Sequence, residues 1–185
     1  MSGYQPIIIN GVVVSKGYRD CDTRWKIIKP YIGKSVLDIG SHYGFFVYKI
    51  LTELNSEVTS IEMDLKQAAI QKKMLRDNNL KADVRVIRFN PNTDFEPVET
   101  ILLLAVIHYF SPGEVSRLFK ILRNKCKTLI IEIPNSAEKV ASKPVLQQDI
   151  LGMLRESFNV QPIGEVSSPQ SKFIKRTLYK CTVVL

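Results

Sequence analysis

The feature of this sequence that most constrains its fold is a regular alternation of short apolar segments with amphipathic ones. Apolar runs of strand length, rich in β-branched residues, begin at residues 35, 57, 83, 100 and 126. Most are followed by a run with helical spacing of apolar residues, such as the face formed by Phe46, Ile50 and Leu54. We count five such strand–helix units, an order that predicts a mostly parallel sheet with helices on both faces.

The end of the chain departs from this alternation. The last predicted helix, at residues 145–158, has an apolar stripe of Val145, Ile150, Leu151 and Leu154. Two predicted strands, 159–166 and 173–185, then follow with no helix between them, so they should pair antiparallel. A plain dinucleotide-binding fold would continue with parallel strands. We therefore predict a three-layer, doubly wound α/β fold whose seven-stranded sheet is mostly parallel with an antiparallel terminal strand.

The N-terminal part predicts a small hairpin and a lead-in helix. Asn10-Gly11 accepts the positive φ angles of a type I′ turn and lies between two β-branched runs. The helix after it could be capped by Asp20 or Asp22, and Pro30 should stop or kink it.

The length bounds the domain organisation, because 185 residues bury one sizeable core. We predict one domain, 1–185, with residues 1–34 as hairpin and lead-in helix and 35–185 as core.

No apolar run approaches the ~20 residues that span a bilayer. The N-terminus lacks the basic region and the long apolar run of a signal peptide. We expect a cytoplasmic protein with no membrane partner.

Cysteine, histidine and charge exclude some function classes. Cys21, Cys126 and Cys181 are too scattered for a disulfide framework or a CxxC metal site, and His42 and His108 are too few for a multi-histidine site. The formal net charge is +8 and the pI about 9.4, which permits RNA binding. The basic residues are spread along the chain, which favours the simpler interpretation of solvated helix faces.

The loop "DIGSHYG", residues 38–44, follows the first predicted core strand, where ligands bind in doubly wound sheets. A P-loop needs Gly-Lys-Ser/Thr, but Gly44 is followed by phenylalanine. The dinucleotide fingerprint needs glycine at positions that hold His42 and Phe45, whose side chains would hinder a pyrophosphate. What remains is the pattern of Asp38, Gly40 and Gly44.

With this pattern the chain resembles the class I S-adenosylmethionine-dependent methyltransferases, from about residue 20 to its end. It departs from their first motif at His42, which stands where the family often has a glycine. The resemblance implies S-adenosyl-L-methionine as cofactor and no metal. It also implies these cofactor-binding candidates: Asp38 near the methionyl amino group, with Gly40, Ser41, His42, Tyr43, Gly44, Glu62, Phe89, Asn90 and Ala105 around the rest of the cofactor.

Glu62 ends the second core strand and lies 22 residues after Gly40, close to the ~20-residue spacing of ribose-binding acids. Asp64 is the alternative, although it better fits the cap of the next helix. Phe89 or Asn90 could contact adenine. Each residue also has a purely structural interpretation; Asp38, for example, could accept hydrogen bonds from loop amides.

The segment after the fourth strand, "AVIHY", resembles small-molecule members of the family, and the Asn/Asp-Pro-Pro-aromatic tetrad of adenine-amino methyltransferases is absent. His108 is the candidate catalytic residue, because a histidine titrates near neutrality; it could equally be structural. Tyr43 and Tyr109 could shape the acceptor pocket. By position in the lead-in helix, Tyr18, Arg19 and Arg24 could approach the cofactor.

The function expected from the resemblance is methyl transfer to an unidentified acceptor, with a small molecule favoured over RNA. A non-catalytic binding module with the same fold stays open, because the loop is altered. A nucleotide-dependent oxidoreductase is disfavoured by the side chains at His42 and Phe45.

Overall fold

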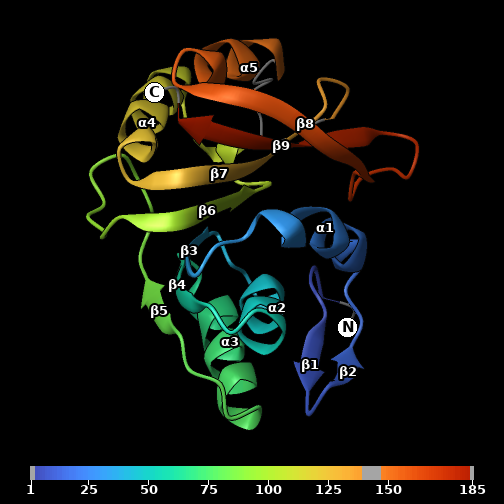
Figure 1. Ribbon diagram of the computed structural model, residues 1–185. Helices are drawn as coiled ribbons and strands as arrows, with labels where there is room; N and C mark the ends of the chain where they lie inside the picture. Colours follow the sequence, from blue (N-terminus) through green and yellow to red (C-terminus); the bar gives the residue numbers. More distant parts are fainter. Residues whose placement is uncertain (1–2, 139–146, 184–185) are drawn as a thin grey trace.

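The computed structural model describes residues 3–138 and 147–183. Their main feature is a seven-stranded sheet in the order β5-β4-β3-β6-β7-β9-β8, in which β9 runs antiparallel to both its neighbours and the other pairs are parallel (Figure 1). The predicted doubly wound fold with an antiparallel terminal strand is confirmed. The strands are β3 (Ser35–Ile39), β4 (Glu57–Glu62), β5 (Asp83–Val86), β6 (Val98–Leu104), β7 (Cys126–Ile133), β8 (Phe158–Ser167) and β9 (Lys175–Val183).

Two apolar cores lie on opposite faces of the sheet, because successive strand residues point to opposite sides. Val36 packs with α1 (Cys21–Ile28), α2 (Phe45–Glu53) and α3 (Leu65–Asp77). Its neighbour Leu37 packs in the other core, with α4 (Pro112–Arg123) and α5 (Gln147–Arg155). Of the predicted stripe of α5, Ile150, Leu151 and Leu154 pack in this second core, and Val145 lies outside the described residues.

The N-terminal hairpin forms as predicted, from β1 (Ile7–Ile9) and β2 (Val12–Ser15). Asn10 and Gly11 have φ angles of 50° and 76°, as a type I′ turn requires. Asn78, at the end of α3, holds the hairpin: its Oδ1 accepts from the Asn10 amide at 2.8 Å and its Nδ2 donates to the Ile8 carbonyl at 2.8 Å. The hairpin therefore lies beside α3 (Figure 1).

Asp20 caps α1, accepting a hydrogen bond from the Thr23 amide at 3.1 Å. The helix ends at Ile28 and passes into the short 3₁₀ helix η1 (Lys29–Tyr31), which contains Pro30. Both details agree with the sequence. None of the helices in the described part of the chain is long and apolar enough to cross a bilayer.

The count of five strand–helix units was one too many, because β5 is followed by the turn-rich loop that the sequence of residues 90–99 predicts. The predicted strand at 83–89 ends at Val86, and residues 87–97 lead to β6 without a helix. The reason lies in the pairing, since Val86 is registered with Glu62, the last residue of β4, and the chain has no further partner there.

The fold places the candidate site at the carboxyl-terminal edge of the sheet. The chain moves outward from β3 to β4 and β5, then returns to the other side of β3 as β6. The strand order thus reverses between β3 and β6, and ligands of doubly wound sheets bind at such a point. The loop of residues 40–44 follows β3 and lies at this edge.

Candidate functional site

The loop after β3 has three residues in the left-handed backbone region: Gly40 (φ 75°), His42 (φ 54°) and Gly44 (φ 81°). A Cβ atom at Gly40 would lie 2.5 Å from Val106 Cγ2, and one at Gly44 would lie 2.5 Å from Gln71 Cγ. Both glycines are therefore required by backbone angle and by space. His42 adopts the left-handed conformation without being glycine, which histidine tolerates better than bulky or β-branched residues do.

Gln71 of α3 holds this loop from behind. The Ser41 hydroxyl donates to Gln71 Oε1 at 2.8 Å, and Gln71 Nε2 donates to the Ser60 hydroxyl at 2.8 Å. All three side chains are buried. Ser41 and Gly44 therefore shape the loop, and neither lines the adjoining cavity.

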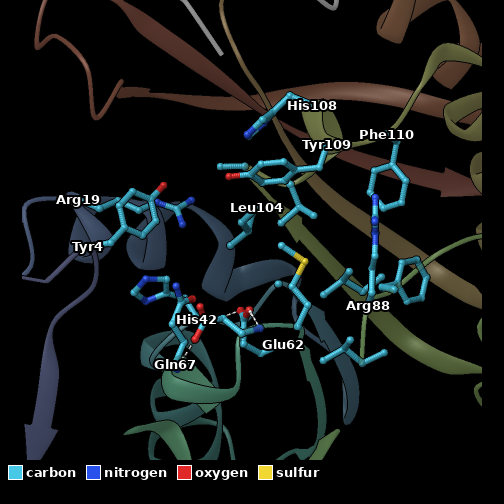
Figure 2. Close-up of a pocket in the computed structure, with 18 of the residues that line it drawn as sticks. Tyr4, Arg19, His42, Glu62, Gln67, Arg88, Leu104, His108, Tyr109 and Phe110 are labelled. Carbon is cyan, nitrogen blue, oxygen red and sulfur yellow. Dashed lines mark hydrogen bonds between the residues drawn. The ribbon is translucent and has the colours of Figure 1, made fainter. Parts of the chain in front are cut away.

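A cavity of about 760 Å³ opens in front of the loop (Figure 2). Figure 2 shows Tyr4 and Arg19 on one side, His108 and Tyr109 across from them, and Glu62 near the loop. Most of the residues singled out from the sequence line it: Tyr18, Arg19, Gly40, His42, Glu62, Asp64, Phe89, Asn90, Ala105, His108 and Tyr109. The others do not: Arg24, Asp38, Ser41, Tyr43 and Gly44.

Glu62 is held at the end of β4 by two backbone amides. Its Oε2 accepts from the His42 amide at 2.8 Å and its Oε1 accepts from the Asp64 amide at 2.9 Å. A carboxylate has about four acceptor sites, so both oxygens can accept further hydrogen bonds from a ligand in the cavity. Asp64 itself caps α3, accepting from the amides of Lys66 and Gln67, as its position predicted.

Asp38, at the end of β3, lies behind the cavity wall. It is 2% exposed, and its Oδ2 has no hydrogen-bond partner among the described residues. Burial raises the pKa of Asp38 to about 7, against the lowering effect of Arg19 and with a further upward contribution from Glu62. An unpaired buried carboxyl is costly unless a donor reaches it, which marks this atom as a place for a cationic group.

The two residues predicted to contact adenine, Phe89 and Asn90, also make contacts within the protein. Phe89 packs its ring against Phe95 and Phe110, with centroids 6.1 and 6.5 Å away. Asn90 Oδ1 accepts from the Asn92 amide at 2.8 Å, so this side chain forms a local turn. Phe89 and Asn90 also line the cavity, so their contact with adenine stays a prediction.

Two cavity residues that sequence reasoning missed are large, apolar and exposed. Met63 follows Glu62 directly and is 62% exposed; Ile87 follows β5 and is 41% exposed. Exposed apolar side chains at the rim of a cavity favour a flat apolar ligand between them. The available signal was an apolar residue immediately after the acid that ends β4.

The far side of the cavity comes from the segment after β6. Ala105 has a φ of 62°, an unfavourable angle that turns the chain into the short 3₁₀ helix η2 (Ile107–Tyr109). His108 Nδ1 is buried without a partner in the described part of the chain. Burial lowers the pKa of His108 to about 4; Arg176 lowers it further and Glu138 opposes this. The imidazole is therefore neutral near pH 7 and can accept a hydrogen bond.

His42, in the loop after β3, resembles His108 in its burial and in the direction of its pKa shift. Its Nδ1 is also buried without a partner within the described residues, and burial, then Arg19, lowers its pKa to about 4 while Asp64 opposes them. Its ring lies between two tyrosines, with centroids 5.2 Å from Tyr4 and 4.0 Å from Tyr43. Tyr43 thus supports the His42 ring from outside the cavity.

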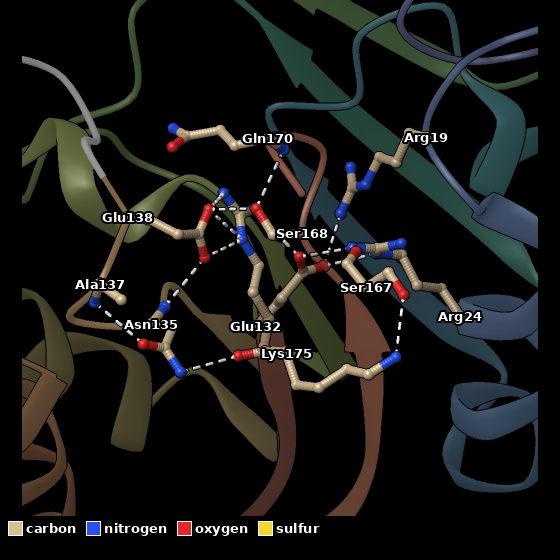
Figure 3. A network of polar contacts seen from close by, with 11 residues as sticks. Arg19, Arg24, Glu132, Asn135, Ala137, Glu138, Ser167, Ser168, Gln170 and Lys175 are labelled. Carbon is tan, nitrogen blue, oxygen red and sulfur yellow. Dashed lines mark hydrogen bonds and ion pairs between the residues drawn. The ribbon is translucent and has the colours of Figure 1, made fainter. Parts of the chain in front are cut away.

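A buried network of charges forms the remaining wall (Figure 3). Glu132, in β7, accepts from Arg19 at 2.6 Å, from Arg24 at 2.8 Å and from Arg176 at 3.1 Å. Glu138 pairs with Arg176 at 2.6 Å. Burial alone would raise the pKa of Glu132, but the arginines, Arg19 foremost, outweigh it and hold that pKa well below its usual range. Arg19, which the sequence had singled out by its position, lines the cavity together with Arg176. For Arg176 and Glu132 the available signal was an acid within the apolar run of β7.

Solved structures of similar fold include several methyltransferases. WbdD, described as a bifunctional kinase-methyltransferase, matches with a TM-score of 0.78 at 20% identity over 92% of this chain, which spans only 42% of WbdD. An S-adenosylmethionine-dependent methyltransferase from Clostridium acetobutylicum matches at 0.67 and 11% identity, covering 89% of each chain. No family model and no curated protein matches the sequence. The chain has the class I S-adenosylmethionine-dependent methyltransferase fold, as its motifs predicted.

Proposed function

We propose that this protein is an S-adenosylmethionine-dependent methyltransferase. The observation that carries the proposal is one cavity, at the reversal point of the sheet, that brings together the glycine loop, Glu62 and the neutral His108. These groups come from three different strand ends and converge on one space. The likeness in fold to known methyltransferases supports the same conclusion.

The chemistry of the wall fits the proposed cofactor part by part. The free acceptor sites of Glu62 suit a pair of ribose hydroxyls, and the exposed faces of Met63 and Ile87 suit an adenine ring. Asp38 lies behind this wall, and we assign its unpaired Oδ2 to the methionyl ammonium, reached through a bridging water molecule. When bound, this cofactor supplies a methyl group activated by a sulfonium.

The protein's own contribution is mainly positioning. Methyl transfer is an in-line displacement, and holding two reactants in register supplies a large part of such a rate enhancement. His108 adds an unprotonated nitrogen across the cavity from the loop; we assign it to hold the acceptor by accepting a hydrogen bond, since a pKa near 4 makes it a weak base at neutral pH.

The acceptor that we propose is a small molecule. A cavity of about 760 Å³ lies in the upper part of the ~300–1,000 Å³ range of small-molecule sites, which leaves room for an acceptor beside a cofactor. RNA is the second candidate acceptor because of the net charge of +8. Titration of a fluorescent RNA oligonucleotide into the protein at low and at physiological salt distinguishes the two acceptor classes. Tight RNA binding that weakens steeply with added salt favours RNA as the acceptor, and no RNA binding at low salt excludes it.

Titration calorimetry with S-adenosylhomocysteine tests the cofactor. We expect the wild-type protein to bind it and Glu62→Ala to weaken binding about 10- to 100-fold, since hydrogen bonds to charged groups contribute roughly 1.5–3 kcal/mol. Glu57→Ala is the matched control, because Glu57 is an exposed acid at the opposite end of the same strand. Absence of binding by the wild-type protein would leave a non-catalytic use of the fold.

A further inference from the structure

The wall of the cavity around His108 contains more positive than negative charge. In the described part of the chain, three guanidinium groups and two carboxylates form the buried network beside it: Arg19, Arg24, Arg176, Glu132 and Glu138. The proposed cofactor does not remove this excess of one positive charge, because its ammonium and carboxylate cancel and its sulfonium is a further cation. Buried charge without compensation is unfavourable, because its hydration is lost without replacement. This wall therefore favours an acceptor that carries one negative charge.

The acids that line the cavity do not compensate the network. Three of them do so, in separate places: Glu62, Asp64 and Glu114. Asp64 and Glu114 are exposed, so water and salt screen their charges. Glu62 is held near the glycine loop by two backbone amides. The excess positive charge is thus left to the wall around His108.

Arg176 has hydrogen-bond donors left for an anionic acceptor. A guanidinium carries five N–H hydrogens. Hydrogen bonds within the described residues use three of those of Arg176: Nε and Nη2 donate to Glu138, and Nη1 donates to Glu132. One hydrogen remains on each Nη, and Arg176 lines the cavity. Arg24, by contrast, donates four hydrogen bonds within the protein and does not line the cavity.

His108 and Tyr109 complete this end of the cavity. After burial, Arg176 lowers the pKa of His108 more than any other charged group does, which places the two side chains near each other. The rings of His108 and Tyr109 lie on the same wall, with centroids 4.2 Å apart (Figure 2), and Tyr109 is 60% exposed. The end therefore offers a cation with spare donors, a hydrogen-bond acceptor and an exposed flat ring.

We propose that the acceptor is a small carboxylic acid whose carboxylate binds the two remaining N–H hydrogens of Arg176. Its apolar body packs on Tyr109, and the group that receives the methyl donates a hydrogen bond to His108. A carboxylate is planar and carries one charge, which matches two spare donors and one excess charge. A phosphate monoester carries about −1.5 to −2 at pH 7 and fits this balance less well. The inference rests on the proposed function and names the class of its acceptor.

Histidine-selective NMR tests this, because His42 and His108 are the two histidines of the chain. Protein with isotope-labelled histidine is saturated with S-adenosylhomocysteine and titrated with benzoate, benzyl alcohol or phenyl phosphate; His108→Gln assigns the signals. We expect benzoate to shift the His108 signal saturably. Its half-saturation concentration should be at least about tenfold lower than that of benzyl alcohol, the scale of a charge-assisted hydrogen bond.

Two variants test the role of Arg176. Arg176→Lys keeps a cation beside Glu138 but loses the forked donors, so the half-saturation concentration of benzoate should rise at least about threefold. Lys175→Gln is the matched control, because Lys175 is the preceding residue of β9, is exposed and does not line the cavity. Benzoate should bind this variant within about twofold of the wild-type protein. An equal loss in both variants would mean attraction by surface charge and would overturn the proposal.

The remaining outcomes separate this proposal from the proposed function. If the wild-type protein does not bind S-adenosylhomocysteine, the proposed function fails and the acceptor site fails with it. If it binds S-adenosylhomocysteine but benzoate binds no better than benzyl alcohol, or less well than phenyl phosphate, cofactor binding stands and the carboxylate site is wrong. Unchanged benzoate binding in Arg176→Lys has the same meaning. Should Arg176→Lys not fold, the comparison of the three probes on the wild-type protein decides.

Discussion

At the scale of single residues, burial gives the Asp38 carboxyl an ionisation that depends on the groups beside it. Buried beside the glycine loop with one oxygen unpaired, it has its pKa raised to about 7. It is therefore only partly ionised near neutrality. A cationic group placed against it would favour the ionised form, so binding of such a group would release the proton that Asp38 carries.

The coupling predicts a pH dependence with a definite sign. Below pH 7 the free protein holds the proton on Asp38, and binding of an ammonium must release it. The affinity for S-adenosylhomocysteine should therefore rise as the pH increases from about 5 to 7 and level off above the pKa. Calorimetry in two buffers of different ionisation enthalpy measures the protons released. The comparison is Asp38→Asn, which should bind S-adenosylhomocysteine more weakly and with an affinity that does not change between pH 5 and 7. An affinity that still rises with pH in this variant would contradict the assignment to Asp38.

At the scale of elements, the start of α2 depends on one residue. Gly44 caps the helix at a φ of 81°, and a Cβ atom there would meet the side chain of Gln71, whose hydrogen bonds hold the loop. Replacement of Gly44 by alanine would both strain the backbone and displace the buried side-chain amide of Gln71. The loop and the helix behind it are thus one unit.

We expect Gly44→Ala to lower the free energy of unfolding by about 2–4 kcal/mol, the combined scale of a left-handed alanine and a disrupted buried hydrogen bond. Urea unfolding followed by circular dichroism measures it. Gly113→Ala is the control: Gly113 lies in α4 with open space around its Cβ position, so alanine should stabilise the protein by roughly 0.5–1 kcal/mol. Equal stability of the two variants would show that the loop can relax.

How far the sequence predicts this structure depends on whether a feature is local. The hairpin turn, the caps at Asp20 and Asp64 and the placement of Glu62 follow from neighbouring residues, and all were predictable. The end of β5 was not, because it is set by where β4 stops, and register cannot be read from one strand alone. The network around Glu132 was hidden for the same reason: Arg19 and Glu132 are 113 positions apart.

At the scale of the whole molecule, Glu132 joins parts of the chain that are distant in sequence. It binds Arg19 before α1, Arg24 within α1 and Arg176 in the last hairpin. Removing its charge would leave three guanidinium groups buried around a neutral amide. Such a change is costly, because the desolvation of each cation is no longer compensated.

We predict that Glu132→Gln lowers the free energy of unfolding by about 3–5 kcal/mol, the usual cost of breaking a buried ion pair. Asp77→Asn, which removes an exposed pair with Lys73 on α3, should change it by less than about 1 kcal/mol. Urea unfolding of both variants at the same pH makes the comparison. If Glu132→Gln lowers the free energy of unfolding as little as Asp77→Asn does, water must reach the charge network.

The position of Arg176 also has a consequence for the protein during its synthesis. The cavity wall combines residues as early as Tyr4 and as late as Arg176. On the ribosome, the glycine loop, Glu62 and His108 emerge well before that last wall residue does. A nascent chain therefore cannot complete the wall of this cavity until translation has passed residue 176 and β9 has entered the sheet between β7 and β8.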